Sequence, residues 1–174
     1  NTLTYLQVEG QNIGTSSGTI LFSTAAGLSL GNSNNTISYC KIRDRSDATG
    51  RPSIGIFSLG TATFINANNS ILNNEIFNYY STATTQAGIY ISTNASGWTI
   101  QGNSFYQTES RANIASLSHF GIYINNAGNN YTIKGNYFGG SEASCGGTSY
   151  TFTGTTSGTL NPIYFNPASA ATGC

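Results

Sequence analysis

The chain has 174 residues, a formal net charge of zero, and charged side chains at only 7% of its positions. It offers no basic surface for nucleic acid or an anionic membrane, and no apolar run long enough to span a bilayer. Asn, Ser, Thr and Gly supply the polar surface instead. The start at Asn1, without a start Met or a signal peptide, suggests that upstream sequence has been removed or left out.

From its first residues onward the chain repeats two short apolar patterns. One has two apolar residues five positions apart, at Leu3 and Val8, Ile37 and Ile42, Ile71 and Ile76, Ile100 and Phe105, and Ile133 and Phe138. The other resembles Gly-Ile-Tyr-Ile and contains Ile20, Ile56, Ile89, Ile122 and Ile163. Between Gly88 and Gly140 both patterns occur twice, at an offset of 33 residues. A fixed offset of this kind is typical of solenoids, propellers and arrays.

These patterns predict strands, because they consist of β-branched and aromatic residues between Gly, Asn and Ser and lack helical periodicity. One connection in each repeat has a constant length, two others vary, and the hairpin turns of a propeller blade are missing. We therefore predict an all-β fold, a right-handed parallel β-helix (solenoid) of about five coils with three short strands per coil. The handedness follows from the preference of parallel crossovers.

The whole chain, residues 1–174, is expected to form a single β-helix segment that belongs to a longer chain or stack. A loop insertion is expected at 139–162, before the last strand. Neither end resembles an amphipathic cap, and uncapped coils expose strand edges that invite further coils or another copy.

Stacked coils would turn the repeated positions into inward files of apolar side chains. At the constant corner, Asn74, Asn103 and Asn136 fall in register between the paired apolar residues. Because Asn tolerates a left-handed backbone and can pass hydrogen bonds to the coils above and below, we predict an asparagine ladder. Leu6 and Cys40 take its place in the first two coils, so Cys40 is expected to be a small buried residue.

Four phrases carry a family resemblance: NNTISYCKIRD (34–44), AGIYIS (87–92), GWTI (97–100) and GIYINN (121–126). With them, the chain resembles the β-helix modules of very large secreted proteins of Bacteroidota, which the type IX secretion system typically exports. The resemblance covers residues 3–140. It implies an extracellular or cell-surface location and an adhesin-like or structural role, although the expected C-terminal sorting domain is not visible.

An enzyme must also be considered, since many parallel β-helices cleave polysaccharides with carboxylates that converge on one sheet face. The chain has six acidic residues: Glu9, Asp44, Asp47, Glu75, Glu109 and Glu142. They do not fall in one column on neighbouring coils, so we predict no catalytic residue. The densest charge cluster contains Asp44, Asp47 and Arg51. It is interpreted as a self-neutralising solvated edge, with a ligand- or calcium-binding loop as the alternative.

Three further polar features have simple interpretations. His119 is expected at a loop edge with a local hydrogen bond, because no Ser and acid suggest a triad around it. Glu109 and Arg111 are expected to form at most a weak surface pair. Asn34, Asn68, Asn94 and Asn130 begin N-x-S/T sequences and are interpreted as turn residues, not glycan acceptors.

The aromatic residues Phe57, Tyr90, Tyr123 and Tyr164, with Leu21, are predicted to form an outward column. Exposed, they could bind sugar rings or a partner protein; the simpler interpretation is that they stack on each other and on a covering loop. Tyr79, Tyr80 and Tyr106 carry the same ambiguity.

Cys145 and Cys174 could form a disulfide that closes a loop of about 30 residues, worth roughly 3 kcal/mol, or could be free thiols.

These observations favour a non-catalytic structural or adhesive module of a secreted or cell-surface protein, able to form filaments. The alternative is a polysaccharide-binding or polysaccharide-degrading β-helix. We expect no cofactor, no metal, no nucleic acid partner and no membrane insertion. The expected partners are flanking β-helix coils of the same chain or another copy, and surface glycans.

Overall fold

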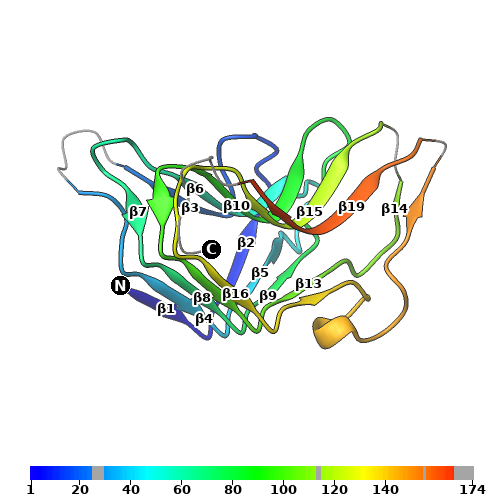
Figure 1. Ribbon diagram of the computed structural model, residues 1–174. Coiled ribbons are helices and arrows are strands. Elements are labelled where there is room, and N and C mark those ends of the chain that lie inside the picture. Colours follow the sequence, from blue (N-terminus) through cyan, green and yellow to red (C-terminus); the bar gives the residue numbers. More distant parts are fainter. Residues whose placement is uncertain (25–29, 113–114, 155, 167–174) are drawn as a thin grey trace.

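The protein is a three-sided solenoid of parallel strands (Figure 1). The computed structural model describes residues 1–24, 30–112, 115–154 and 156–166. Three parallel sheets of five strands each run along the solenoid, and neighbouring strands in a sheet come from successive coils. This arrangement confirms the predicted parallel β-helix of five coils with three strands per coil. Within the described residues, no helix is long and apolar enough to cross a membrane.

Each sheet takes one strand from every coil. Sheet 1 contains β1 (Thr2–Thr4), β4 (Thr36–Ser38), β8 (Ser70–Leu72), β12 (Thr99–Gln101) and β16 (Thr132–Lys134). Sheet 2 contains β3 (Ile20–Ser23), β6 (Ile54–Leu59), β10 (Gln86–Thr93), β15 (Ser118–Ile124) and β19 (Thr159–Phe165). Sheet 3 contains β2 (Gln7–Gly10), β5 (Lys41–Asp44), β9 (Glu75–Phe77), β13 (Ser104–Tyr106) and β17 (Tyr137–Phe138).

Shorter elements occur in the connections of variable length. They include a two-stranded sheet of β7 (Asn66–Ala67) and β11 (Ala95–Ser96). A second two-stranded sheet contains β14 (Arg111–Ala112) and β18 (Phe152–Thr153). In the part of the chain that the structure describes, one 3-10 turn, η1, spans Ala143–Cys145.

The apolar residues of the repeat align in three files, one from each sheet. The sheet 1 file is Leu3, Ile37, Ile71, Ile100 and Ile133. The sheet 2 file is Ile20, Ile56, Ile89, Ile122 and Ile163. The sheet 3 file is Val8, Ile42, Ile76, Phe105 and Phe138.

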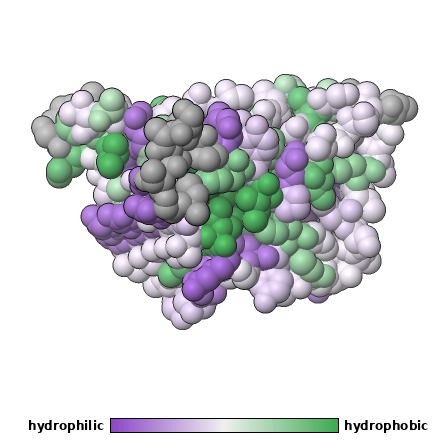
Figure 2. Space-filling model, viewed as in Figure 1, coloured by the Kyte–Doolittle hydropathy of each residue, from purple (hydrophilic) through white to green (hydrophobic). Residues whose placement is uncertain are grey.

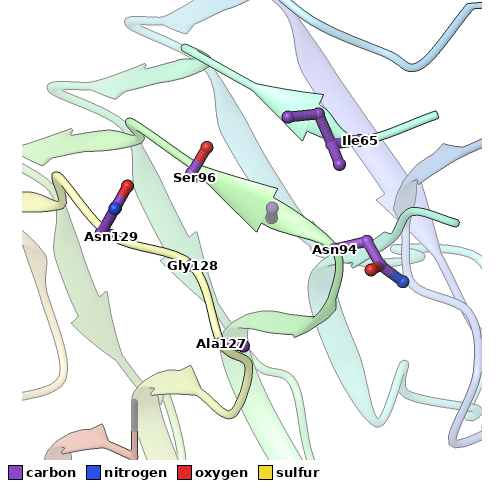
Figure 3. A pocket seen from close by; sticks show the side chains of 7 residues that line it. Ile65, Asn94, Ser96, Ala127, Gly128 and Asn129 are labelled. Atoms are coloured by element: carbon purple, nitrogen blue, oxygen red, sulfur yellow. The ribbon is translucent and has the colours of Figure 1, made fainter. Parts of the chain in front are cut away.

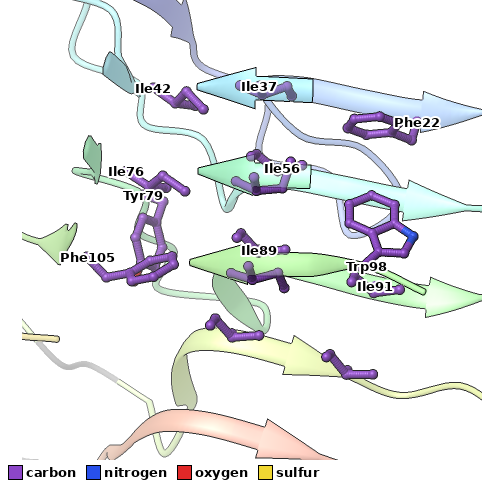
Figure 4. Packing of buried hydrophobic residues seen from close by; sticks show 14 of the residues in the cluster. Phe22, Ile37, Ile42, Ile56, Ile76, Tyr79, Ile89, Ile91, Trp98 and Phe105 are labelled. Atoms are coloured by element: carbon purple, nitrogen blue, oxygen red, sulfur yellow. The ribbon is translucent and has the colours of Figure 1, made fainter. Parts of the chain in front are cut away.

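These files form the hydrophobic core, in which their central members are fully buried (Figure 4). Each buried Ile contributes about 1.5–3 kcal/mol before the entropy of ordering it is subtracted. Ile163, by contrast, is 46% exposed, because its strand β19 pairs on one side only within the described residues. Cys40 is buried, as predicted.

The asparagine ladder lies at the corner between sheets 1 and 3. Asn103 Oδ1 accepts hydrogen bonds from the backbone N and the Nδ2 of Asn74, both at 2.9 Å. Its own Nδ2 donates to the carbonyl of Ile71 and to Oδ1 of Asn136. Asn74 Oδ1 accepts from the backbone N of Cys40, so the ladder also serves a coil that has no asparagine at this position.

One detail of the ladder prediction is wrong: the ladder asparagines do not carry the left-handed backbone. That conformation belongs to the preceding residue of every coil, with φ between 53° and 69°: Tyr5, Tyr39, Asn73, Gly102 and Gly135. The division has a physical reason, since a left-handed residue turns the chain while the next side chain points inward to bond the neighbouring rungs. Asn34, Asn68, Asn94 and Asn130 also have positive φ and are turn residues in the structure.

The Gly that opens each Gly-Ile-Tyr-Ile pattern is needed where sheets 2 and 3 approach each other. A Cβ at Gly88 would lie 2.4 Å from Cδ1 of Phe105, and one at Gly121 would lie 2.4 Å from Cδ1 of Phe138. A larger residue at either position would clash with one of these two rings, which stack on each other with centroids 5.0 Å apart. The repeated Gly therefore allows sheet 2 to pack closely against the Phe side chains of sheet 3.

The expected loop at 139–162 needs a corrected boundary. It contains η1 and β18, and the last strand β19 already begins at Thr159. Thr159 pairs with Ser118, and Asn161 pairs with Phe120. Asn161 and Pro162 resemble turn residues in the sequence, but Pro is tolerated in a strand with an open edge.

Candidate functional site

An aromatic file runs along the outer face of sheet 2. Tyr90 lies opposite Phe57 on one neighbouring strand and opposite Tyr123 on the other, and Tyr123 lies opposite Tyr164. The rings of Tyr90 and Tyr123 stack with centroids 4.4 Å apart and planes at 19°. The pairs Phe57–Tyr90 and Tyr123–Tyr164 each meet edge to face at 5.2 Å. The structure thus brings together the four aromatic residues of the predicted column.

Exposure changes along this file. Phe57 is only 2% exposed, Tyr90 and Tyr123 are half-buried, and Tyr164 is 42% exposed. Phe57 thus follows the simpler of the two interpretations, since it packs against Tyr90 and leaves no open surface for a ligand. Tyr123 also stacks on Phe120 at 4.4 Å, so its ring face is largely occupied by other rings.

A groove of about 290 Å³ borders the aromatic file. Its polar lining includes the hydroxyl side chains of Thr15, Ser16, Thr85 and Ser92. Among the described residues, no charged side chain lines it. Burial raises the pKa of the Tyr123 hydroxyl, with smaller contributions from Tyr90 and Tyr164. The groove is therefore neutral. It can offer hydroxyl groups and ring edges to a ligand, and fewer free ring faces than the sequence suggested.

A closed ring of polar side chains lies at the edge of sheet 3. Asp44 Oδ1 accepts from Asn78 Nδ2 at 3.0 Å, and Asn78 Oδ1 accepts from Arg111 Nη2 at 2.8 Å. Glu109 Oε2 then receives both Arg111 Nη1, at 3.2 Å, and Arg51 Nη2, at 3.1 Å. Arg51 Nε closes the ring 3.8 Å from Asp44 Oδ2. The five residues come from three successive coils.

Burial in this ring differs from the solvated edge that the sequence suggested. The side chain of Asp44 is 11% exposed and that of Arg111 only 3%, whereas that of Glu109 is 66% exposed. Arg111 is anchored further by Nε, which donates to Gln107 Oε1 at 2.7 Å. Burial lowers the pKa of Arg111, and Arg51 lowers it further, while Glu109 opposes the shift. The interpretation of Arg111 and Glu109 as a weak surface pair is therefore wrong.

Asp47 does not join the ring. Its carboxylate pairs with Arg45, which donates at 2.8 and 2.7 Å, and both side chains are exposed. The hydrogen bonds from Arg45 lower the pKa of Asp47. Asp47 thus fits the self-neutralising surface that was predicted for the whole cluster. Among the described residues, no three His, Cys, Asp or Glu side chains gather as a metal site would require.

His119 is buried in strand β15, so its predicted place at a loop edge is wrong. The ring stacks on Tyr79 with centroids 4.9 Å apart and planes at 6°. Nδ1 lies 2.9 Å from Gln86 Oε1, and Nε2 lies 3.2 Å from the Tyr150 hydroxyl. Burial, and secondarily Arg111, lower the pKa of His119 from 6.5 to about 3. The imidazole is therefore neutral and packs as part of the structure.

Tyr79, Tyr80 and Tyr106, which the sequence left as either stacked or exposed residues, are also buried. Tyr79 and Tyr80 are 2% and 9% exposed, and the Tyr80 hydroxyl donates to the carbonyl of Ala112. The Tyr106 hydroxyl donates to Glu75 Oε2 at 2.7 Å. None of the three is an exposed recognition residue, because the connection after β13 and the segment containing β18 fold back over this edge.

Two further hollows lie in the connections. One of about 260 Å³ lies between β11, Ile65 and the segment 127–129, and its lining side chains are uncharged (Figure 3). The other, of about 210 Å³, lies between the β13–β14 connection and the segment before β18. Hydroxyl side chains and Glu109 line it, so it opens onto the exposed member of the polar ring.

Sequence reasoning missed Asn78 and Gln107 and placed Arg111 on the surface, although a signal for the first two exists. Asp44, Asn78 and Gln107 each stand two residues after the buried residue of the sheet 3 file. This column of polar residues could have been recognised in the aligned repeats. Arg111 gives no such signal, because it lies in a connection of variable length.

The predicted disulfide cannot be compared with the structure. Cys145 is exposed, while Cys174 lies outside the described residues.

Comparison with known proteins supports the architecture. A family model described as a right-handed beta helix region matches residues 4–157. No curated protein and no solved structure gives a match. Since the matched region covers most of the 174 residues, the chain belongs to the right-handed β-helix family.

Proposed function

We propose that the chain is a non-catalytic structural and adhesive β-helical module of a secreted or cell-surface protein. The observation that carries this proposal is that the repeated residues of the sequence form contacts between neighbouring coils. They supply buried apolar files, an asparagine ladder and an aromatic file, and all of these act between neighbouring coils. Such a sequence stabilises a rigid stack of coils.

The adhesive surface in this proposal is the neutral groove beside the aromatic file. Its hydroxyl side chains and the exposed edge of Tyr164 suit an uncharged sugar better than an acidic one. We expect a glycan array to give a signal that Tyr90→Ala and Tyr123→Ala remove in a chain that still folds. Binding that survives in both variants would place the adhesive surface elsewhere.

A second candidate function is cleavage of a polysaccharide, favoured by one observation. Asp44 and Glu109 converge on the same guanidinium group, that of Arg51, from two different coils. Two carboxylates within about 10 Å satisfy the spacing of a glycosidase pair. Against this, Asp44 already bonds Arg43 and Asn78, and both carboxylates form ion pairs with arginines.

One experiment separates the two candidates. The chain is incubated with a panel of soluble polysaccharides, and new reducing ends and unsaturated products are measured. We expect none above the level of a heat-inactivated sample. Products that disappear in Glu109→Gln would overturn the non-catalytic proposal and establish the second candidate.

The proposed partners are flanking coils of the same chain or of another copy. Within the described residues, β1, β2 and β3 at one end of the solenoid, and β16, β17 and β19 at the other, each pair on one side only. Strand β19 also exposes Leu160, Ile163 and Phe165, and hydrophobic surface lies near the centre of the face in Figure 2. Light scattering tests whether one copy of the chain stacks on another. A molar mass that grows with protein concentration supports stacking, and a constant monomer mass contradicts it.

The location and export route are proposed from the resemblance to secreted Bacteroidota proteins alone. Antibody labelling of intact source cells tests the location, since an intracellular protein would be labelled only after lysis.

A further inference from the structure

Around the polar ring at the edge of sheet 3, arginines share a smaller number of carboxylates. Asp44 is shared by Arg43 and Arg51, and Glu109 is shared by Arg51 and Arg111. Three guanidinium groups, those of Arg43, Arg51 and Arg111, thus share two carboxylates. The next pair along the chain, Arg45 with Asp47, is neutral by itself, and Glu9 of the neighbouring strand lies opposite Arg43.

A second, independent observation concerns Arg51. Its Nε is buried and makes no hydrogen bond within the described residues. Asp44 Oδ2, at 3.8 Å, is too far for one. A buried donor without an acceptor carries a desolvation cost, so the hydrogen-bonding capacity of the Arg51 guanidinium is not fully used within the described residues. The guanidinium is nevertheless reachable, because its side chain is 31% exposed.

The third observation is the position of Glu109. A single oxygen, Oε2, receives both guanidinium groups, yet this side chain is 66% exposed and lines the hollow of about 210 Å³. Arg111, in contrast, is held rigidly by Gln107 and Asn78. Arg111 is fixed and the Glu109 carboxylate is the more exposed partner, so this carboxylate is the member that another anion can displace.

We propose that Arg51 and Arg111 form an oxyanion-binding site, in which the Glu109 carboxylate occupies the position that a ligand's carboxylate, sulfate or phosphate group takes. The planar donors of Arg suit such groups. The hydroxyl groups of Ser110, Ser141 and Thr148 line the adjoining hollow and suit the polar remainder of the ligand. The site is separate from the neutral groove, which contains no charged residue among those described.

The test uses Glu109→Gln, which keeps an amide oxygen for the arginines but removes the competing charge. Sodium sulfate is titrated at constant ionic strength against sodium chloride, and the Nε–H signals of the arginines are followed by NMR. We expect the Arg51 signal to shift and saturate, with sulfate bound on the order of tenfold more tightly by Glu109→Gln than by the original chain, because one like charge is removed.

The controls are two double variants. Adding Arg51→Gln to Glu109→Gln should abolish saturable binding, whereas adding Arg45→Gln, which removes an exposed arginine outside the ring, should leave it unchanged. Thermal unfolding checks that each variant is folded. Equal effects of sulfate and chloride, or equal losses in the two double variants, would overturn the proposal. Acetate and phosphate titrations then separate a carboxylate ligand from a tetrahedral oxyanion.

Discussion

His119 makes the stability of the folded chain depend on pH, because its imidazole must stay neutral in the native state. The ring is 2% exposed, and its pKa falls from 6.5 to about 3 through burial and the nearby Arg111. At a pH between these two values, the unfolded chain binds a proton that the folded chain excludes. Stability is therefore complete above pH 6.5 and is lost as the pH falls toward 3.

The magnitude follows from proton linkage. With pKa values of 6.5 unfolded and about 3 folded, the free energy of unfolding should be about 2 kcal/mol lower at pH 5 than at pH 8, at roughly 1.4 kcal/mol per pH unit. This is a large part of a net stability of about 5–15 kcal/mol. Below about pH 5 carboxylates also begin to titrate, so the effect of His119 is best isolated above that value.

The measurement is urea unfolding of the original chain and of His119→Phe, at about pH 8, 6.5 and 5. Phe keeps a ring against Tyr79 but loses the hydrogen-bonding partners Gln86 and Tyr150. The variant should be less stable at high pH, yet its stability should change by about 2 kcal/mol less between pH 8 and 5. An equal pH dependence in both proteins would refute the assignment of the effect to His119.

Three further predictions concern packing and covalent stability. Asn103→Ala removes a fully buried amide from the ladder, so urea unfolding should show a loss of about 2–4 kcal/mol; unchanged stability would mean that the ladder gives no net stabilisation. Gly88→Ala should cost more than about 2 kcal/mol, because its Cβ would lie 2.4 Å from Phe105, and adding Phe105→Leu should restore part of the loss. If Cys145 and Cys174 pair, reduction should lower the free energy of unfolding by about 3 kcal/mol, and Cys145→Ser should remove this difference; an effect of reduction that persists in the variant would contradict the pairing.

The polar edge of sheet 3 shows where interpretation of the sequence alone fails. Asp44 belongs to a charged run and resembles a solvated residue, but its partners Asn78 and Arg111 lie far along the chain. Arg111 is buried because β14 pairs with β18, in a segment that looked like a plain loop. Connections of variable length have no repeated spacing, so their folding cannot be inferred from the alignment of the coils.

The outer aromatic file shows a similar division. Its order is fixed by the repeat, and Tyr90 and Tyr123 are neighbours as predicted. Whether the rings face solvent or each other depends on side-chain rotamers and on the neighbouring Phe120, which stacks on Tyr123. Spacing determines which residues meet, whereas the available recognition surface depends on packing.

The sequence by itself determined the coil, its five rungs and its apolar files, because parallel strands in register convert equal spacing along the chain into direct contact across the sheet. The tertiary structure alone decided which polar residues are buried and which remain reachable. Arg51, Glu109 and Arg111 meet through connections that fold back over the edge of sheet 3. Such contacts depend on the path of each connection in space, and no period in the sequence records that path.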